Sequence, residues 1–414
     1  MFLAVLAEDT AAAVRVSAGE PSDLWLNITG GALSKPYASS SMPAFALGDF
    51  SLSVESGCFP LADIRHALML AGSSQNLEKV RVPSGSWIPR GAVADHIAFD
   101  GTPFFFPGTC NMMEQGGRWG HQPPFDNPDH FIHLAWFLMK NVWDVDFLTR
   151  PLAGLSLWDR LELAFSVPPI DPDSDLVICG ESDRGANCVL MNEVVQTGRL
   201  LFASLLRMQA ALEMEDLMSW GGDTGKAFFY EGAATSIRGQ LVPVFGLPGG
   251  LLKASTGVSA QPDVWGTAFA VHRGLLPPER EELACRALAL ACQENEALWR
   301  GLVRPVPVSA DFSPLGAWEK MIQPVPRWTG QNGAYWAAPA GWVIDAVSRV
   351  APKQAIGMAE ALIGHFLEED FRLSGPPGAP WQCGAPPDHR QAGICLASAA
   401  CPISALRRMG WMRG

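Results

Sequence analysis

Two aspartates stand where helices are expected to begin. Asp129 follows Asp126-Asn127-Pro128 and opens an apolar segment, and Asp263 precedes Val264-Trp265 at the start of another. A carboxylate held at a helix N-terminus can act as a general acid or base, but Asp and Asn at such positions also cap helices. Both interpretations stay open for both sites. If Asp263 is ionised, the helix dipole would lower its pKa and suit it to the role of a base.

Residues 331–342 have the composition of a sugar-binding wall. The segment contains Gln331, Asn332, Tyr335, Trp336 and Trp342 and no charged residue. Aromatic rings stack on the apolar face of a pyranose, and amide side chains supply both donors and acceptors to its hydroxyls. We therefore predict that Gln331, Asn332, Tyr335 and Trp336 line a carbohydrate site.

Other loops carry further candidates for substrate binding. A long loop from about residue 104 to 129 contains aromatic residues and a Gly-rich turn, and loops of this length are often functional. Arg184 lies in a charged turn, where it binds vicinal hydroxyls or simply pairs with Asp183. The further candidates are Phe106, Trp119, Asp126, Arg184, Asn192, Trp265 and Trp381.

Other kinds of site are not indicated. The chain has no GxSxG elbow, no Walker loop and no GxGxxG after a strand, so nucleophilic serine and nucleotide chemistry are not expected. Asp129 and His133 are four residues apart, but with His121 and His130 they match no closed zinc pattern. We predict neither a metal nor a cofactor.

The composition excludes several classes of partner. The net charge of −12 and the pI of about 5.1 disfavour nucleic acid and anionic membrane surfaces. Nine cysteines without a CxxC pair indicate a reducing compartment, and no apolar run reaches membrane length. We expect a soluble cytoplasmic protein with a carbohydrate ligand, and the oligomeric state is not predicted.

Hydrophobic periodicity predicts a mainly helical chain after a β-rich start. Residues 1–58 are expected to form short strands, at 1–7, 24–28 and 50–54. Residues 93–107 are expected to pair as a hairpin turning at Asp100-Gly101. Helices are predicted at 60–71, 129–142, 144–165, 192–218, 223–243, 263–274, 278–298, 334–350, 352–370 and 389–408. Consecutive long helices suggest hairpins arranged in a ring, with the functional loops collected at one end.

Three segments together resemble the six-hairpin glycosidase superfamily. They are Phe105-Phe106-Pro107-Gly108-Thr109, Gln261-Pro262-Asp263-Val264-Trp265-Gly266-Thr267-Ala268, and Gln331-Asn332-Gly333-Ala334-Tyr335-Trp336 with Gly341-Trp342. The resemblance covers about residues 90 to 400. It implies an (α/α)6 toroid over residues 59–414, behind the β-rich segment 1–58.

The same resemblance implies a reaction. Asp129 and Asp263 would be the catalytic carboxylates at the mouth of the toroid, with Glu193 as another possible acid. They would cleave a small neutral glycoside or oligosaccharide, and inversion is the commoner route in such enzymes. Related sequences tend to have Trp-Glu at Trp381-Gln382 and an acidic residue at Asn192. A non-catalytic carbohydrate-binding or scaffold protein, or another α/α-barrel sugar enzyme such as an epimerase, lyase or phosphorylase, therefore stays an alternative.

Overall fold

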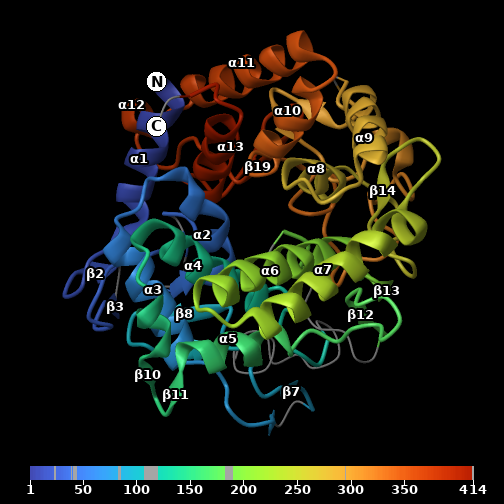
Figure 1. Ribbon diagram of the computed structural model, residues 1–414. Helices are drawn as coiled ribbons and strands as arrows, with labels where there is room; N and C mark the ends of the chain where they lie inside the picture. Colours follow the sequence, from blue (N-terminus) through green and yellow to red (C-terminus); the bar gives the residue numbers. More distant parts are fainter. Residues whose placement is uncertain are drawn as a thin grey trace.

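The computed structural model describes residues 1–22, 25–38, 40, 44–82, 85–106, 120–181, 190–293 and 295–412. Helices in these residues form two concentric rings (Figure 1). The inner helices are α2 (Leu47–Ser53), α4 (Asn127–Val142), α6 (Leu201–Trp220), α8 (Val264–His272), α10 (Ala340–Ser348) and α13 (Leu396–Arg408). Each packs against the next, and α13 packs against α2, so the inner ring is closed.

The outer helices alternate with the inner ones along the chain. They are α1 (Phe2–Val14), α3 (Leu61–Ser73), α5 (Leu157–Phe165), α7 (Thr224–Phe245), α9 (Pro278–Ala291) and α11 (Pro352–Glu368). The short helices η1 (Val54–Ser56), η2 (Val145–Thr149), η3 (Val308–Ala310) and α12 (Phe371–Ser374) lie between them. The arrangement is the predicted (α/α)6 toroid.

Composition explains which helices lie inside. Every residue of α8 is buried, and its sequence VWGTAFAVH has no Asp, Glu, Lys or Arg. In α9, by contrast, only Ala284, Cys285, Ala287 and Leu288 are buried, and its first turns carry Glu279 and Glu281. A helix that is apolar all round must be covered on all sides, whereas an amphipathic helix needs one covered face. The inner and outer positions follow from this difference.

Long segments precede every inner helix. The chain therefore gathers its irregular structure at the N-terminal ends of the inner helices, which we call the loop end of the toroid. The largest sheet is antiparallel, in the order β16-β17-β18-β19-β20, and is formed by such segments. These strands are β16 (Leu298–Trp299), β17 (Leu302–Val303), β18 (Tyr335–Trp336), β19 (Cys383–Ala385) and β20 (His389–Gln391).

The remaining strands are short, and most pair with a nearby strand. They are β1 (Arg15–Val16), β2 (Pro21–Ser22), β3 (Trp25–Leu26), β4 (Leu33–Ser34), β5 (Ala44–Ala46), β6 (Val80–Arg81), β7 (Trp87–Ile88), β8 (His96–Ala98), β9 (Pro103–Phe104), β10 (Pro151–Leu152), β11 (Leu155–Ser156), β12 (Ile178–Cys179), β13 (Gly198–Arg199), β14 (Leu252–Lys253) and β15 (Pro262–Asp263). Strand β5 instead pairs with the more distant β8. The predicted hairpin at Asp100-Gly101 is confirmed, because β8 pairs antiparallel with β9 and Gly101 has φ +90°.

Two predicted N-terminal strands are wrong. Residues 1–7 belong to helix α1, and residues 50–53 belong to helix α2. The apolar start continues through the alanines of Phe2–Val14, so the helix is long enough to bury Leu3, Leu6 and Val14 against α13. The two ends of the chain consequently lie near each other (Figure 1). A separate unit ending at residue 58 stays a prediction, since the buried core runs without interruption from Leu3 to Leu406.

Several predicted helices are shorter than expected, among them 278–298, which ends at Ala291, and 389–408, which begins at Leu396. The segment 144–165 contains the β10–β11 hairpin, whose turn residues Ala153 and Gly154 have φ of 46° and 92°. Helix α6 begins at Leu201 rather than 192, because residues before it pair with other loops, as in the bridge of Val194 with Met321. The segment 334–350 begins with strand β18. Local periodicity does not report such pairing with distant segments.

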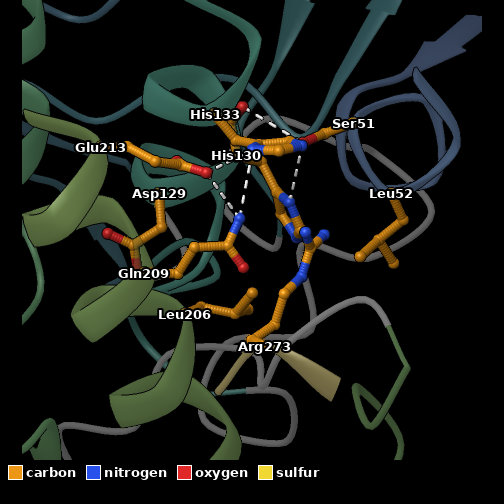
Figure 2. A pocket seen from close by; sticks show the side chains of 9 residues that line it. All are labelled: Ser51, Leu52, Asp129, His130, His133, Leu206, Gln209, Glu213 and Arg273. Carbon is orange, nitrogen blue, oxygen red and sulfur yellow. Dashed lines mark hydrogen bonds and ion pairs between the residues drawn. The ribbon is translucent and has the colours of Figure 1, made fainter. Parts of the chain in front are cut away.

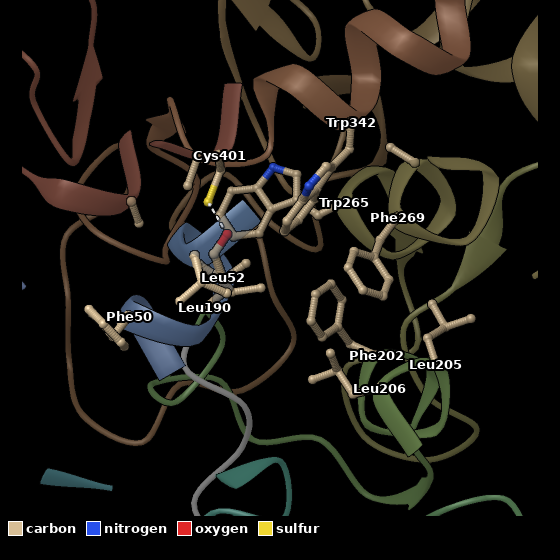
Figure 3. Packing of buried hydrophobic residues seen from close by; sticks show 14 of the residues in the cluster. Phe50, Leu52, Leu190, Phe202, Leu205, Leu206, Trp265, Phe269, Trp342 and Cys401 are labelled. Atoms are coloured by element: carbon tan, nitrogen blue, oxygen red, sulfur yellow. Dashed lines mark hydrogen bonds between the residues drawn. The ribbon is translucent and has the colours of Figure 1, made fainter. Parts of the chain in front are cut away.

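The inner ring is filled by large apolar side chains (Figure 3). Phe202 of α6, Phe269 of α8 and Trp342 of α10 lie with ring centroids 5.0–6.2 Å apart. In the described part of the chain, no helix combines the length and apolar character needed to cross a bilayer.

Candidate functional site

Asp129 lies in the first turn of α4. Asn127 and Pro128 begin this helix, and Asp126 precedes it but makes no side-chain capping hydrogen bond. Of the two residues that could cap this helix, Asp126 or Asn127, Asp126 therefore does not do so through its side chain. Its Oδ2 instead lies 3.4 Å from Nε2 of His130, one turn further along α4.

The side chain of Asp129 faces a small pocket inside the toroid (Figure 2). The pocket lies between α2, α4, α6 and the C-terminal end of α8. Its lining residues are Ser51, Leu52, Asp129, His130, His133, Leu206, Gln209, Glu213 and Arg273. His133 Nδ1 lies 2.6 Å from Glu213 Oε1, and Gln209 Nε2 donates to the same oxygen over 2.7 Å.

Asp129 is almost completely buried in this pocket, and neither carboxyl oxygen has a hydrogen-bond partner among the described residues. Burial raises its pKa well above the ordinary aspartate value, and the nearby Asp126 and Glu213 raise it further against the opposing charge of Arg207. Burial thus favours the protonated form of Asp129. No group of three His, Cys, Asp or Glu residues within the described ranges is arranged to hold a metal ion.

Sequence reasoning did not identify Glu213 as part of this pocket. The sequence feature that could have identified Glu213 is its position on the apolar face of α6. Leu206, Ala210, Glu213 and Leu217 follow helical spacing there, and all four are buried. A charged residue on a buried face requires a polar partner. Glu213 finds it in His133 and Gln209.

Asp263 lies at the opposite end of α8 from this pocket. It precedes Val264, the first residue of α8, whereas the pocket is lined by Arg273 directly after His272, the last. Nine helical residues separate the two positions, which corresponds to roughly 14 Å along the axis. Asp263 is not among the residues that line this pocket, and a shared site for Asp129 and Asp263 stays a prediction.

Asp263 caps α8, as the structural interpretation expected. Its carboxyl accepts a hydrogen bond of 2.8 Å from the backbone N–H of Gly266, and its carbonyl accepts one of 2.6 Å from Thr267 Oγ1. The expectation of a lowered pKa is wrong. Burial raises the pKa of Asp263 to about 7, because desolvation outweighs the hydrogen bonds from Gly266 and Trp265.

The amide side chains of the predicted sugar wall are engaged within the protein. Gln331 Nε2 donates to Asn192 Oδ1 over 2.6 Å, and Asn332 Oδ1 accepts from the Ala317 N–H over 2.9 Å. Asn332 Nδ2 also donates to the Val325 carbonyl over 2.7 Å. Both side chains are buried, so in this structure they tie loops together.

The aromatic residues of the wall are buried as well. Trp336 Nε1 donates to the Gly330 carbonyl over 3.0 Å, and Trp265 Nε1 donates to the Val303 carbonyl over 3.1 Å. The two indoles lie 5.5 Å apart at 64°, and Tyr335 is 1% exposed. The structure thus brings Trp265 and the wall together beneath the surface of the loop end.

Trp381 has the carboxylate neighbour that the sequence did not reveal. Its Nε1 donates to Glu369 Oε2 over 2.6 Å, and Arg390 Nη2 donates to Glu369 Oε1 over 3.0 Å. Burial acts to raise the pKa of Glu369, but the hydrogen bonds from Arg390 and Trp381 outweigh it and lower the pKa. Phe106 is buried against Val195 and Ile322. Trp119 and Arg184 lie outside the described residues.

Glu193 is a half-buried carboxyl at the loop end. Burial raises its pKa, against opposing hydrogen bonds from the Gln331 backbone and the Gln323 side chain. A Cβ added to Gly330 would lie 3.2 Å from its Oε2, so this carboxyl rests against the backbone at the start of the wall.

Solved structures with the same fold are glycosidases. One glycosidase is 14% identical, with 100% of this chain and 98% of that chain covered and a TM-score of 0.58. A mannosylglycerate hydrolase from Thermus thermophilus in complex with glucose is 12% identical, with 97% and 99% covered and a TM-score of 0.58. A rhamnosidase from Klebsiella oxytoca with rhamnose bound is 12% identical, with 99% and 64% covered and a TM-score of 0.58.

No family model matches the sequence, and no curated protein matches it either. At these identities the structural likeness establishes the fold. The chain therefore has the six-hairpin glycosidase fold that its sequence resembled.

Proposed function

We propose that this protein is a glycoside hydrolase acting on a small neutral glycoside or oligosaccharide. The observation that carries the proposal is a pair of carboxyl groups with raised pKa, Asp263 and Glu193, at the loop end of a glycosidase fold. Support also comes from the glucose and rhamnose bound to two of the similar structures.

The loop that contains Gln331 and Trp336 contacts the neighbours of both carboxyl groups. The backbone N–H of Glu193 donates to Gln331 Oε1, and Trp336 packs on Trp265, two residues after Asp263. The proposed sugar site lies at this loop.

The carboxyl groups differ in the role that each suits. With a pKa of about 7, Asp263 retains its proton near neutral pH and can donate it to the leaving oxygen. Glu193, nearer the surface and hydrogen-bonded by Gln331 and Gln323, would accept a proton from water. An inverting reaction needs the carboxyl groups about 6.5–9.5 Å apart with water between them.

Asp129 is the alternative acid, as its position in α4 first suggested. Its raised pKa suits an acid, and Glu213 in the same pocket is a possible base. The small size of the pocket that Asp129 faces favours Asp263 and Glu193.

Hydrolysis assays with three variants separate these assignments. Aryl glycosides and disaccharides are incubated with the wild-type protein and with Asp263→Asn, Glu193→Gln and Asp129→Asn. The first two should lose about 100-fold or more in kcat/KM, and the third should keep most activity. Glu360→Gln, on the exposed face of α11, is the matched control. Full activity in both loop-end variants would contradict the pair.

A non-catalytic carbohydrate-binding protein is the second candidate. It is favoured by the amides at Asn192 and Gln382, where related sequences tend to be acidic. Sugar-dependent changes in tryptophan fluorescence without any turnover would select it over the hydrolase.

A further inference from the structure

The outer helix α7 presents an apolar face without a cover in the described structure. Its buried side packs on α6, through residues such as Tyr230, Ile237 and Leu241. On its other side Phe228 is 74% exposed and Phe229 is 64% exposed. The exposed face continues along the helix with Gly232, Thr235, Gly239 and Pro243. Large aromatic side chains so exposed favour association with an apolar partner surface.

Two opposite charges lie on one flank of this face, on either side of its middle along the axis. Glu231 lies four residues before Thr235, and Arg238 lies three residues after it. At 100° per residue both project on the same flank of the helix. Each lies within about 6 Å of Thr235 along the axis.

This symmetry fits a second copy of the same helix. Two identical helices can pack antiparallel about a two-fold axis. Each residue then faces a residue of the second helix that lies at the same distance beyond the axis and on the same flank. With the axis midway between Ala234 and Thr235, Glu231 of one copy faces Arg238 of the other, and Arg238 faces Glu231. Phe228 then lies level with Leu241 and Val242.

The surroundings of Glu231 support a cation from outside the chain. Glu215 and Asp216 of α6 lie nearby, and burial together with two neighbouring charges, Glu231 and Asp216, raises the pKa of Glu215. An arginine arriving here would neutralise an excess of negative charge.

We infer that the exposed face of α7, from Phe228 to Pro243, is a self-association surface, on which a second copy of this chain packs antiparallel with reciprocal Glu231–Arg238 ion pairs. The inference is independent of the proposed hydrolysis, because α7 belongs to the outer ring and carries none of the residues assigned to it.

Sedimentation velocity over a range of protein concentrations tests this arrangement. The wild-type protein should form a concentration-dependent dimer. Glu231→Arg and Arg238→Glu should each weaken it about tenfold or more, since each places like charges opposite each other. The double variant should restore the wild-type affinity, because the pairs are remade with their signs exchanged. A monomer at every concentration, or a double variant as weak as the single ones, would overturn the inference.

A matched pair of glycines controls for effects on folding. A side chain at Gly232 would meet no atom of the described residues within 4 Å, and the same is true of Gly357 on α11. Gly232→Arg should therefore leave the fold intact, as judged by circular dichroism, and abolish the dimer. Gly357→Arg should leave the dimer unchanged. Equal effects of both substitutions would contradict a role for α7.

Discussion

Gln331 connects two loops that are far apart in the sequence, because its Nε2 donates to Asn192 Oδ1 over 2.6 Å. Its Oε1 accepts from the backbone N–H of Glu193 over 2.7 Å. One buried amide thereby fixes the residues on which the carboxyl of Glu193 depends for its position.

Replacing Gln331 with alanine should therefore destabilise the protein. The substitution leaves the Glu193 N–H and the side-chain oxygen Oδ1 of Asn192 without this partner in a partly buried setting, which costs about 1–3 kcal/mol. Urea denaturation measures the loss. Gln240→Ala, on the partly exposed flank of α7, should change the unfolding free energy by no more than about 0.5 kcal/mol. Similar values for both variants would show that Gln331 is not an anchor.

The sequence predicted helices better than it predicted contacts. Helix α7 was expected at 223–243 and spans Thr224–Phe245, because its apolar residues recur at helical spacing over many turns. The first seven residues gave too short a window to distinguish a strand from the start of α1. Aromatic and amide residues at 331–336 have the same composition whether they bind a sugar or fill a core. The folded structure alone shows that the polar atoms of residues 331–336 form hydrogen bonds within the protein, as Gln331 does with Asn192.

Glu213 illustrates the same limit for the interior. Its burial on α6 could be read from the sequence, but its partner His133 lies 80 residues earlier in the chain. A pairing over that separation depends on how α4 and α6 pack in the ring.

The ion pair between Glu55 and Arg273 should make stability depend on pH in the acid range. Both carboxyl oxygens of Glu55 accept from Arg273 Nη1 over 2.9 Å. Burial alone would raise the pKa of Glu55, but Arg273 and His133 outweigh it and hold the pKa at about 2. Because the folded pKa lies below the unfolded value, the contribution is complete above pH 4.5 and is lost as the pH falls towards 2.

Glu55→Gln tests this contribution. At pH 6 the variant should be less stable than the wild type by about 3 kcal/mol, since Arg273 is left without its charged partner. The difference should narrow steadily between pH 4.5 and 2 in urea denaturation. A difference that stays constant over this range would mean that the charge of Glu55 is not the cause.

Asp263 should give the opposite pH dependence. Its pKa is about 7 in the folded protein against the ordinary 3.8, so the folded state binds more protons between these values and stability falls as the pH rises through them. Asp263→Asn retains an oxygen to accept from the Gly266 N–H but cannot ionise. The variant should therefore match the wild type near pH 4 and become relatively more stable towards pH 8. Thermal unfolding at several pH values measures this, and parallel curves would contradict the raised pKa.

The contact between α10 and α13 should tolerate no side chain at Gly341. A Cβ there would lie 2.7 Å from both Ala405 Cβ and Pro402 Cα, so the two helices would have to move apart. Gly341→Ala should lower the unfolding free energy by about 1–3 kcal/mol, as overpacking does. Gly357→Ala in α11 meets none of the described residues within 4 Å and should instead stabilise the helix by about 0.5–1 kcal/mol. The two substitutions are chemically identical, so opposite shifts in melting temperature would show that α10 and α13 are tightly packed at Gly341. A higher melting temperature in both variants would show that the two helices can separate at little cost.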